Sequence, residues 1–135
     1  MDNTLLKKIA SYFSNNKEII SIYLFGSYAE GKERPSSDID IGILLDGEYS
    51  NIEKKIRNKC ILELSRILRK DIHPVILNSA GEELVRQIFL KGKCILATDT
   101  KKLSIYKMIM LSKIVEFSYY RSLMQKGLIK KIMES

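Results

Sequence analysis

The apolar residues of this chain follow two periods, which separate expected helices from expected strands. Residues 3–13 carry apolar side chains at helical spacing, and the turn formers SNN follow them. The stretch EIISIYLF, residues 18–25, is almost continuously apolar and is typical of a strand buried on both faces. After the long loop GSYAEGKERPSS, the stretch DIDIGILL, residues 38–45, alternates acidic and aliphatic residues before it becomes wholly apolar, which predicts a second strand.

The second half of the chain continues this alternation of helices and strands. Residues 51–69 have the pattern of an amphipathic helix, and DIHPVILN, residues 71–78, is typical of a third strand. A short helix containing Leu84, Ile88 and Phe89 is expected to end at Gly92. CILA, residues 94–97, fits a short edge strand, and residues 103–124 return to helical spacing. The order of elements predicts an α/β fold in which helices flank a small mixed sheet.

The composition is typical of one folded domain. With 135 residues, of which 45% are hydrophobic and 29% charged, the chain can bury a core without disulfide or metal support. No apolar run approaches the roughly 20 residues of a membrane span, and the first residues lack the order of a signal peptide, so we expect a cytoplasmic protein. Cys60 and Cys94 lie within apolar patterns without metal-type spacing and are expected to be buried free thiols.

The net charge of +7 is concentrated near one end of the sequence. Residues 1–100 contain 15 Lys and Arg against 14 Asp and Glu, whereas residues 101–135 contain eight against two. We interpret residues 1–100 as the functional domain and residues 101–135 as a basic helical extension packed on it, which either only covers the sheet or also offers a surface to a partner. Direct nucleic-acid binding is not expected, because the segment shows no aromatic platforms and no helix suited to a groove.

Two closely spaced carboxylates stand at the start of the second expected strand. Asp38 and Asp40 are two residues apart, so on a strand both side chains point to one face, with Cα atoms about 6.5 to 7 Å apart. Their mutual repulsion is relieved by a divalent cation, and Mg²⁺ commonly binds through one or two carboxylates together with substrate phosphates. Asp71, which opens the third expected strand, supplies a further carboxylate if that strand is adjacent. The alternative is that the pair only ends a strand at solvent and that Asp71 belongs to a turn.

The residues that follow the first expected strand suit phosphate binding. Gly26 lets the backbone approach a ligand closely, and the Ser27 hydroxyl can point at phosphate oxygens. The alternative is an ordinary turn. Lys32 and Arg34, in the same loop, either meet the charge of a triphosphate or are solvated.

Taken together, these motifs resemble the nucleotidyltransferase superfamily of the DNA polymerase β type. The resemblance rests on GS, nine further residues, and then SDIDI entering an apolar strand, with DIH downstream, and it covers roughly residues 1–100. The stretch GSYAEGKERPSSDIDIGILL is especially similar to minimal nucleotidyltransferases (MNT), many of which are antitoxins paired with HEPN-domain ribonuclease toxins. The resemblance implies a polymerase β-like fold with a small mixed sheet flanked by helices.

The resemblance also implies an activity and a set of site residues. The reaction is transfer of AMP from ATP to a hydroxyl with two Mg²⁺ ions, and in the antitoxin branch the acceptor is a tyrosine of the toxin. Gly26, Ser27 and Ser37 would bind the nucleotide, Asp38 and Asp40 would ligate the ions, and Asp71 would complete the site and could accept the proton of the attacking hydroxyl. A HEPN toxin would be a separate chain in a hetero-oligomer.

Two further readings of the family resemblance stay open at this point. A catalytically inactive module could mask the toxin by contact alone, although all three carboxylates are present. A nucleotidyltransferase could instead modify a small-molecule hydroxyl, although 135 residues leave little room for the additional domain that usually shapes such an acceptor site. The sequence also departs from the family, because Asp71 heads DIHP. His73, the only histidine, is either structural or in contact with substrate.

Overall fold

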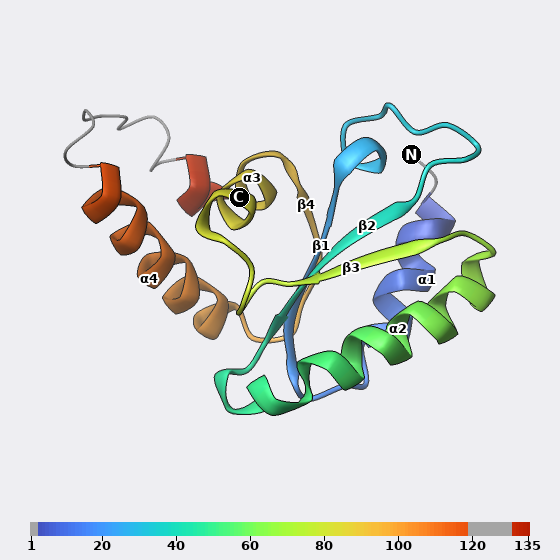
Figure 1. The fold of residues 1–135 in the computed structure, drawn as a ribbon, viewed down its shortest axis with the longest axis horizontal. Helices are drawn as coiled ribbons and strands as arrows, with labels where there is room; N and C mark the ends of the chain where they lie inside the picture. Colours follow the sequence, from blue (N-terminus) through green and yellow to red (C-terminus); the bar gives the residue numbers. More distant parts are fainter. Residues whose placement is uncertain (1–2, 119–130) are drawn as a thin grey trace.

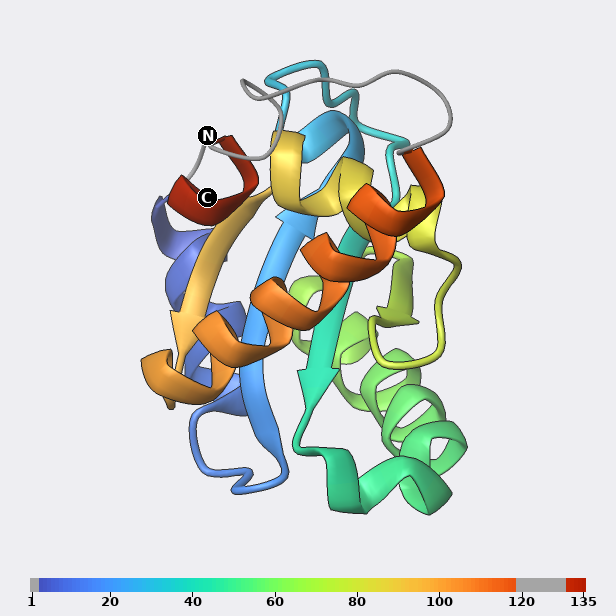
Figure 2. The same cartoon turned by 90° about the vertical axis from the view of Figure 1, so that its left-hand side faces the viewer.

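The computed structural model describes residues 3–118 and 131–135, and it confirms the expected α/β fold with a mixed sheet. A four-stranded sheet lies between two layers of helices (Figure 1). Helices α1 (Asn3–Phe13) and α2 (Glu53–Leu68) cover one face, whereas α3 (Glu82–Lys91) and α4 (Thr100–Ser118) cover the other. Figure 2 shows α4 crossing the strands on its side of the sheet.

The elements of the first half lie close to their expected positions. Strand β1 spans Ile19–Phe25 and is buried along nearly its whole length, as its apolar run predicts. The loop after it begins with a single turn of 3-10 helix, η1 (Gly26–Tyr28), which the sequence pattern did not reveal. Strand β2 spans Ile39–Leu45, so the expectation that Asp38 belongs to this strand is wrong. The ladder starts one residue later, where the Ile39 amide donates to the Asp71 carbonyl oxygen at 2.9 Å.

The elements of the second half also match the predicted order. A 3-10 helix, η2 (Gly47–Ile52), precedes α2, and strand β3 spans Ile72–Ile76, which leaves Asp71 just before the strand. Helix α3 ends at Gly92, where a side chain would come within 2.5 Å of the Ile88 carbonyl oxygen. Strand β4 (Lys93–Ala97) is the expected edge strand. Helix α4 is described as far as Ser118, and the rest of the predicted helix, residues 119–124, lies outside the described residues.

The sheet has the order β3-β2-β1-β4 and contains both kinds of strand pairing. Strand β1 runs antiparallel to β2 and β4, whereas β2 and β3 are parallel. The end of β1 therefore lies beside the start of β2, and the start of β3 lies on the other side of β2. These three strand ends lie at the same end of the sheet, which meets the condition that the third strand be adjacent if Asp71 is to join the pair.

Each face of the sheet has its own hydrophobic core, because neighbouring residues of a strand point to opposite faces. On β2, Ile39, Ile41 and Ile43 pack toward α1 and α2, whereas Leu44 packs toward α3 and α4. Asp40 lies between Ile39 and Ile41 in the sequence, so its side chain points to the opposite face, the one that α3 and α4 cover. It lies beyond the end of the core on that face. The two cores fix the strands that carry the acidic residues.

The basic extension contributes to the second core. Leu103, Met110 and Leu111 of α4 are buried there, and Ile132 near the end of the chain is fully buried in the same cluster. The Lys107 ammonium lies 5.6 Å from the Phe89 ring centroid and donates to the Ser135 carbonyl oxygen. Its burial lowers the pKa of this lysine. Among the described residues, no helix combines the length and the apolar character needed to cross a membrane.

The two cysteines differ in exposure, and the prediction that both are buried is wrong for Cys94. Cys60 is buried between α2 and the sheet, where burial raises the pKa of its thiol to about 12. Cys94 lies on β4, the last strand of the described sheet, and is exposed. Its sulfur nevertheless turns toward the Leu96 carbonyl oxygen at 3.5 Å, and partial burial of the sulfur raises its pKa as well.

This difference predicts unequal thiol reactivity. At neutral pH we expect a disulfide reagent such as DTNB to modify Cys94 in the native protein, and Cys60 only after denaturation, because Cys60 is buried whereas Cys94 is exposed. Counting released thiolate before and after adding urea measures this. Cys94→Ser should abolish the native reaction and Cys60→Ser should leave it intact; two thiols reacting at equal rates in the native protein would contradict the packing of α2.

Candidate active site

The candidate active site lies at the end of the sheet where β1 ends and where β2 and β3 begin. The register pairs Phe25 with Asp40 across β1 and β2, and Asp40 with His73 across β2 and β3. The loop of residues 26–38 extends from this end of the sheet, as the light blue and cyan trace in Figures 1 and 2 shows. Five of the residues predicted from the sequence lie at this end of the sheet: Gly26, Ser27, Asp38, Asp40 and Asp71.

Gly26 lies directly against the carboxylate of Asp40. A Cβ atom placed on Gly26 would come within 2.1 Å of Asp40 Oδ2, which is far inside van der Waals contact. Gly26 also has a φ of +71°, a conformation that other residues adopt only with strain. The position therefore needs glycine for two separate reasons, and the backbone after β1 is held beside an acidic oxygen.

The other oxygen of Asp40 contacts the third strand. His73 Nδ1 lies 3.0 Å from Asp40 Oδ1, within hydrogen-bonding distance. Paired residues of neighbouring strands point to the same face of a sheet, so the register itself places these two side chains together. The Asp40 side chain is 24% exposed and the His73 side chain 65%, so the pair is open to solvent on the imidazole side.

Asp38 and Asp71 flank this pair at the mouth of the two parallel strands. Each immediately precedes one residue of the register pair Ile39 and Ile72, and both are exposed. The hydrogen bond from the Ile39 amide to the Asp71 carbonyl oxygen holds the two segments side by side. The structure thus brings the three predicted carboxylates to the same end of the sheet. Asp40 lies within β2, whereas Asp38 and Asp71 lie just before β2 and β3.

The loop above the site is held by its own backbone and by one lysine. The carbonyl oxygen of Gly26 accepts from the amides of Ala29 and Glu30, which closes the first turn. Lys70, between α2 and β3, donates to the Pro35 carbonyl oxygen at 3.3 Å, and its ammonium lies 5.8 Å from the Tyr28 ring centroid. These contacts connect the loop to the part of the chain that leads into Asp71.

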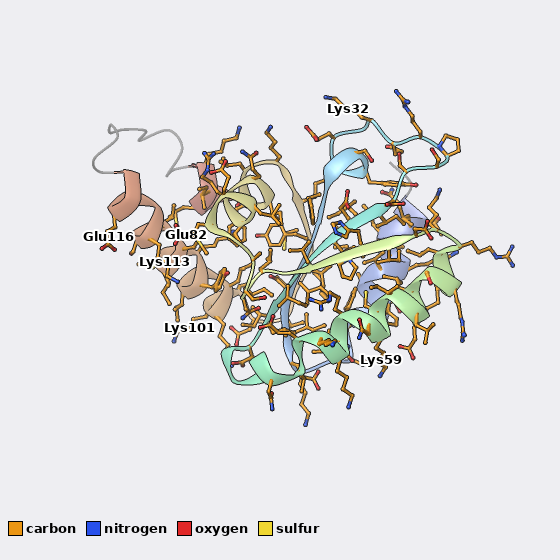
Figure 3. The ribbon with its side chains drawn as sticks, in the orientation of Figure 1. Lys32, Lys59, Glu82, Lys101, Lys113 and Glu116 are labelled. Atoms are coloured by element: carbon orange, nitrogen blue, oxygen red, sulfur yellow. The ribbon has the colours of Figure 1, made fainter. Side chains whose placement is uncertain are left out.

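The remaining polar residues of the loop are arranged differently. The Ser37 hydroxyl accepts from the Arg34 amide at 2.7 Å, so in this structure it closes a turn before Asp38. Lys32 and Arg34 are exposed, and Figure 3 shows Lys32 on the loop, pointing away from the sheet. The sequence had left open whether these two cations are solvated, and here they are.

The donor set fits a hard divalent cation that arrives with a phosphate ligand. Within residues 3–118 and 131–135, no three His, Cys, Asp or Glu side chains are assembled closely enough to hold a metal ion alone. Mg²⁺, however, usually keeps several waters and uses only one or two carboxylates plus substrate phosphates. Asp40 and the exposed Asp38 offer such oxygens, and the lack of a side chain at Gly26 leaves space for Asp40 Oδ2 beside the turn.

Comparisons with known proteins identify the family of this chain. Residues 7–101 match the family model described as "Polymerase beta, Nucleotidyltransferase". The chain is 33% identical over 98 residues to the protein adenylyltransferase MntA of Shewanella oneidensis; the aligned region covers 73% of this chain and 66%, just under two thirds, of that relative.

Solved structures of toxin–antitoxin complexes show the same fold. A chain of a toxin–antitoxin crystal structure with AMP-PNP is 26% identical, with a TM-score of 0.72 and 95% of this chain and 98% of that chain covered. A chain of the complex of tri-AMPylated Shewanella oneidensis HEPN toxin with MNT antitoxin is 25% identical, with a TM-score of 0.68 and coverage of 98% and 99%. Because the family model matches most of this chain, the chain belongs to the polymerase β-type nucleotidyltransferase family.

Proposed function

We propose that this protein is the antitoxin of a HEPN ribonuclease toxin and that it acts as a protein adenylyltransferase, transferring AMP from ATP to a tyrosine hydroxyl of the toxin. The observation that carries the proposal is the Asp40 carboxylate, held against the backbone of Gly26 at the end of the sheet where β1 ends and β2 and β3 begin. The similarity to MntA and to chains of toxin–antitoxin complexes supports the choice of substrate and partner.

The proposal assigns a role to each predicted site residue. Gly26, Ser27 and Ser37 bind the triphosphate, Asp38 and Asp40 are the main metal ligands, and Asp71 is the third carboxylate. Ser37 would exchange its present bond to the Arg34 amide for a nucleotide contact. Two Mg²⁺ ions, when bound, neutralise the phosphates and stabilise the charge that develops at the α-phosphoryl group.

The reaction consists of one substitution at phosphorus. The tyrosine oxygen attacks the α-phosphorus of ATP, the bond from that phosphorus to the bridging oxygen breaks, and pyrophosphate leaves. The hydroxyl proton passes to Asp71, which lies exposed at the mouth of the site. Because Asp71 is exposed, a hydroxyl of another protein can reach its carboxylate.

The basic extension, residues 101–135, is proposed as part of the partner surface, packed on the catalytic domain of residues 1–100. Helix α4 buries Leu103, Met110 and Leu111 against the sheet and leaves Ile105, Met108 and Ile109 about half exposed. One helix thus has an apolar stripe on each of two sides. An exposed apolar stripe next to lysines suits a helical partner with an acidic rim.

An assay of toxin activity distinguishes transfer from masking. We expect an amount of this protein far below equimolar to silence the toxin's ribonuclease activity in the presence of ATP and Mg²⁺, because one enzyme molecule modifies many toxins. With α,β-methylene ATP, which binds but cannot be cleaved at the α-phosphorus, the same amount should leave the toxin active. Inhibition that needs equimolar protein and is the same with either nucleotide would show masking by contact and contradict the proposal.

A further inference from the structure

We propose that His73 is a positioning residue of this site: its Nδ1–H donates to Asp40 Oδ1 and thereby fixes the carboxylate with Oδ2 turned toward the metal and nucleotide. The inference rests on the proposed function, and it assigns a site residue to β3 itself, in addition to Asp71 just before that strand. It starts from the 3.0 Å contact between His73 Nδ1 and Asp40 Oδ1.

The direction of the hydrogen bond follows from the chemistry of the two groups. An ionised carboxylate only accepts hydrogen bonds, so Nδ1 carries the proton and Nε2 carries the lone pair or a second proton. Ligating carboxylates are commonly held by such outer partners, and removal of the partner weakens metal affinity. The backbone supports the pair, because Asp40 and His73 are register partners on parallel strands.

The two oxygens of Asp40 have separate neighbours. Oδ1 contacts His73, whereas Oδ2 lies beside Gly26, at the turn that begins the proposed phosphate-binding loop. A carboxylate with one oxygen fixed has little freedom to rotate, so Oδ2 stays directed toward the loop. Asp71 does not provide this contact, because the register of β2 and β3 places His73, and not Asp71, opposite Asp40.

The chain's single histidine makes the hydrogen bond directly observable. Long-range ¹H–¹⁵N spectra, at a pH where the ring is neutral, report which nitrogen bears the proton. We expect the Nδ1–H form in the wild-type protein and a shift toward the Nε2–H form in Asp40→Ala. A wild-type ring in the Nε2–H form would overturn the inference without affecting the proposed function.

Metal binding tests the consequence without turnover. Titrating Mn²⁺ into protein saturated with α,β-methylene ATP, we expect His73→Ala to weaken binding about 10- to 100-fold. His73→Asn should restore most of the affinity, because the amide nitrogen of Asn, like Nδ1, is bonded to Cγ. His73→Gln, with its nitrogen one bond farther out, is the matched control and should not restore it. Because His73 is exposed, none of these changes should affect folding.

The outcomes separate the two proposals. If the wild type binds Mn²⁺, Asp40→Asn does not, and His73→Ala binds like the wild type, the role of His73 is overturned and the site remains. The same holds if His73→Asn and His73→Gln are equally weak. If Asp40→Asn binds Mn²⁺ like the wild type, the proposed site fails and the inference fails with it.

Discussion

Asp40→Asn is expected to lower the rate of AMP transfer by about 100- to 1,000-fold, which corresponds to about 2.7–4 kcal/mol of lost transition-state stabilisation. Asparagine keeps the size of the side chain but removes the negative charge that would bind the cation. The double variant Asp38→Asn, Asp40→Asn should have no measurable activity. The rate of transfer to purified toxin, with variant and wild type at equal concentration, measures the effect.

Asp46→Asn is the matched control for this experiment. Asp46 directly follows the far end of β2 and pairs with Lys102, at 2.5 Å between Nζ and Oδ2, away from the candidate site. An exposed ion pair of this kind contributes roughly 0–1 kcal/mol to stability. Transfer by Asp46→Asn should therefore match the wild type. Equal losses in the Asp40 and Asp46 variants would mean that negative charge matters generally and would contradict a specific metal site.

Gly26→Ala is expected to reduce transfer by at least about 100-fold, through displacement of Asp40 from a geometry that catalysis needs. The added Cβ would lie 2.1 Å from Asp40 Oδ2, so either the carboxylate or the turn must move. The φ of +71° adds about 1–2 kcal/mol of backbone strain for alanine. Steady-state kinetics and urea unfolding measure the two effects separately.

Gly31→Ala isolates the contact from the strain. Gly31 lies in the same loop and has the same φ of +71°, but a Cβ atom there would meet nothing within 4 Å. Both variants should lose the free energy of unfolding that corresponds to the backbone strain, whereas only Gly26→Ala should lose activity. If Gly31→Ala lost as much activity as Gly26→Ala, loop strain rather than the contact with Asp40 would explain the result.

Much of the fold could be predicted from the sequence because its signals are local. Apolar runs marked β1 and β2, helical spacing marked α1 and α2, and Gly92 marked the end of α3. The sequence left open whether the third strand is adjacent, which is the condition for Asp71 to join the pair, and the parallel pairing of β2 with β3 meets that condition. The prediction failed where one residue decides an outcome, as with Asp38 at the start of β2 or Cys94 on the last strand of the described sheet.

The details of the site depend on the register between neighbouring strands, which cannot be read from the sequence. Asp71 and His73 lie two residues apart on the same expected face of a strand, so periodicity could not choose which of them meets Asp40. The pairing of Ile39 with Ile72 decides it, because it places His73 opposite Asp40. The contact between Gly26 and Asp40 likewise depends on the antiparallel register of β1 and β2.

The most direct test of the central claim follows both ends of the triphosphate. ATP labelled at the α-phosphate or at the γ-phosphate is incubated with this protein, Mg²⁺ and its HEPN toxin partner, and the toxin is separated by denaturing electrophoresis. The proposed reaction transfers the α-label to the toxin, releases the γ-label as pyrophosphate, and stops when EDTA is added. Label from the γ-phosphate on the toxin, or an unlabelled toxin that is nevertheless inhibited, would contradict it.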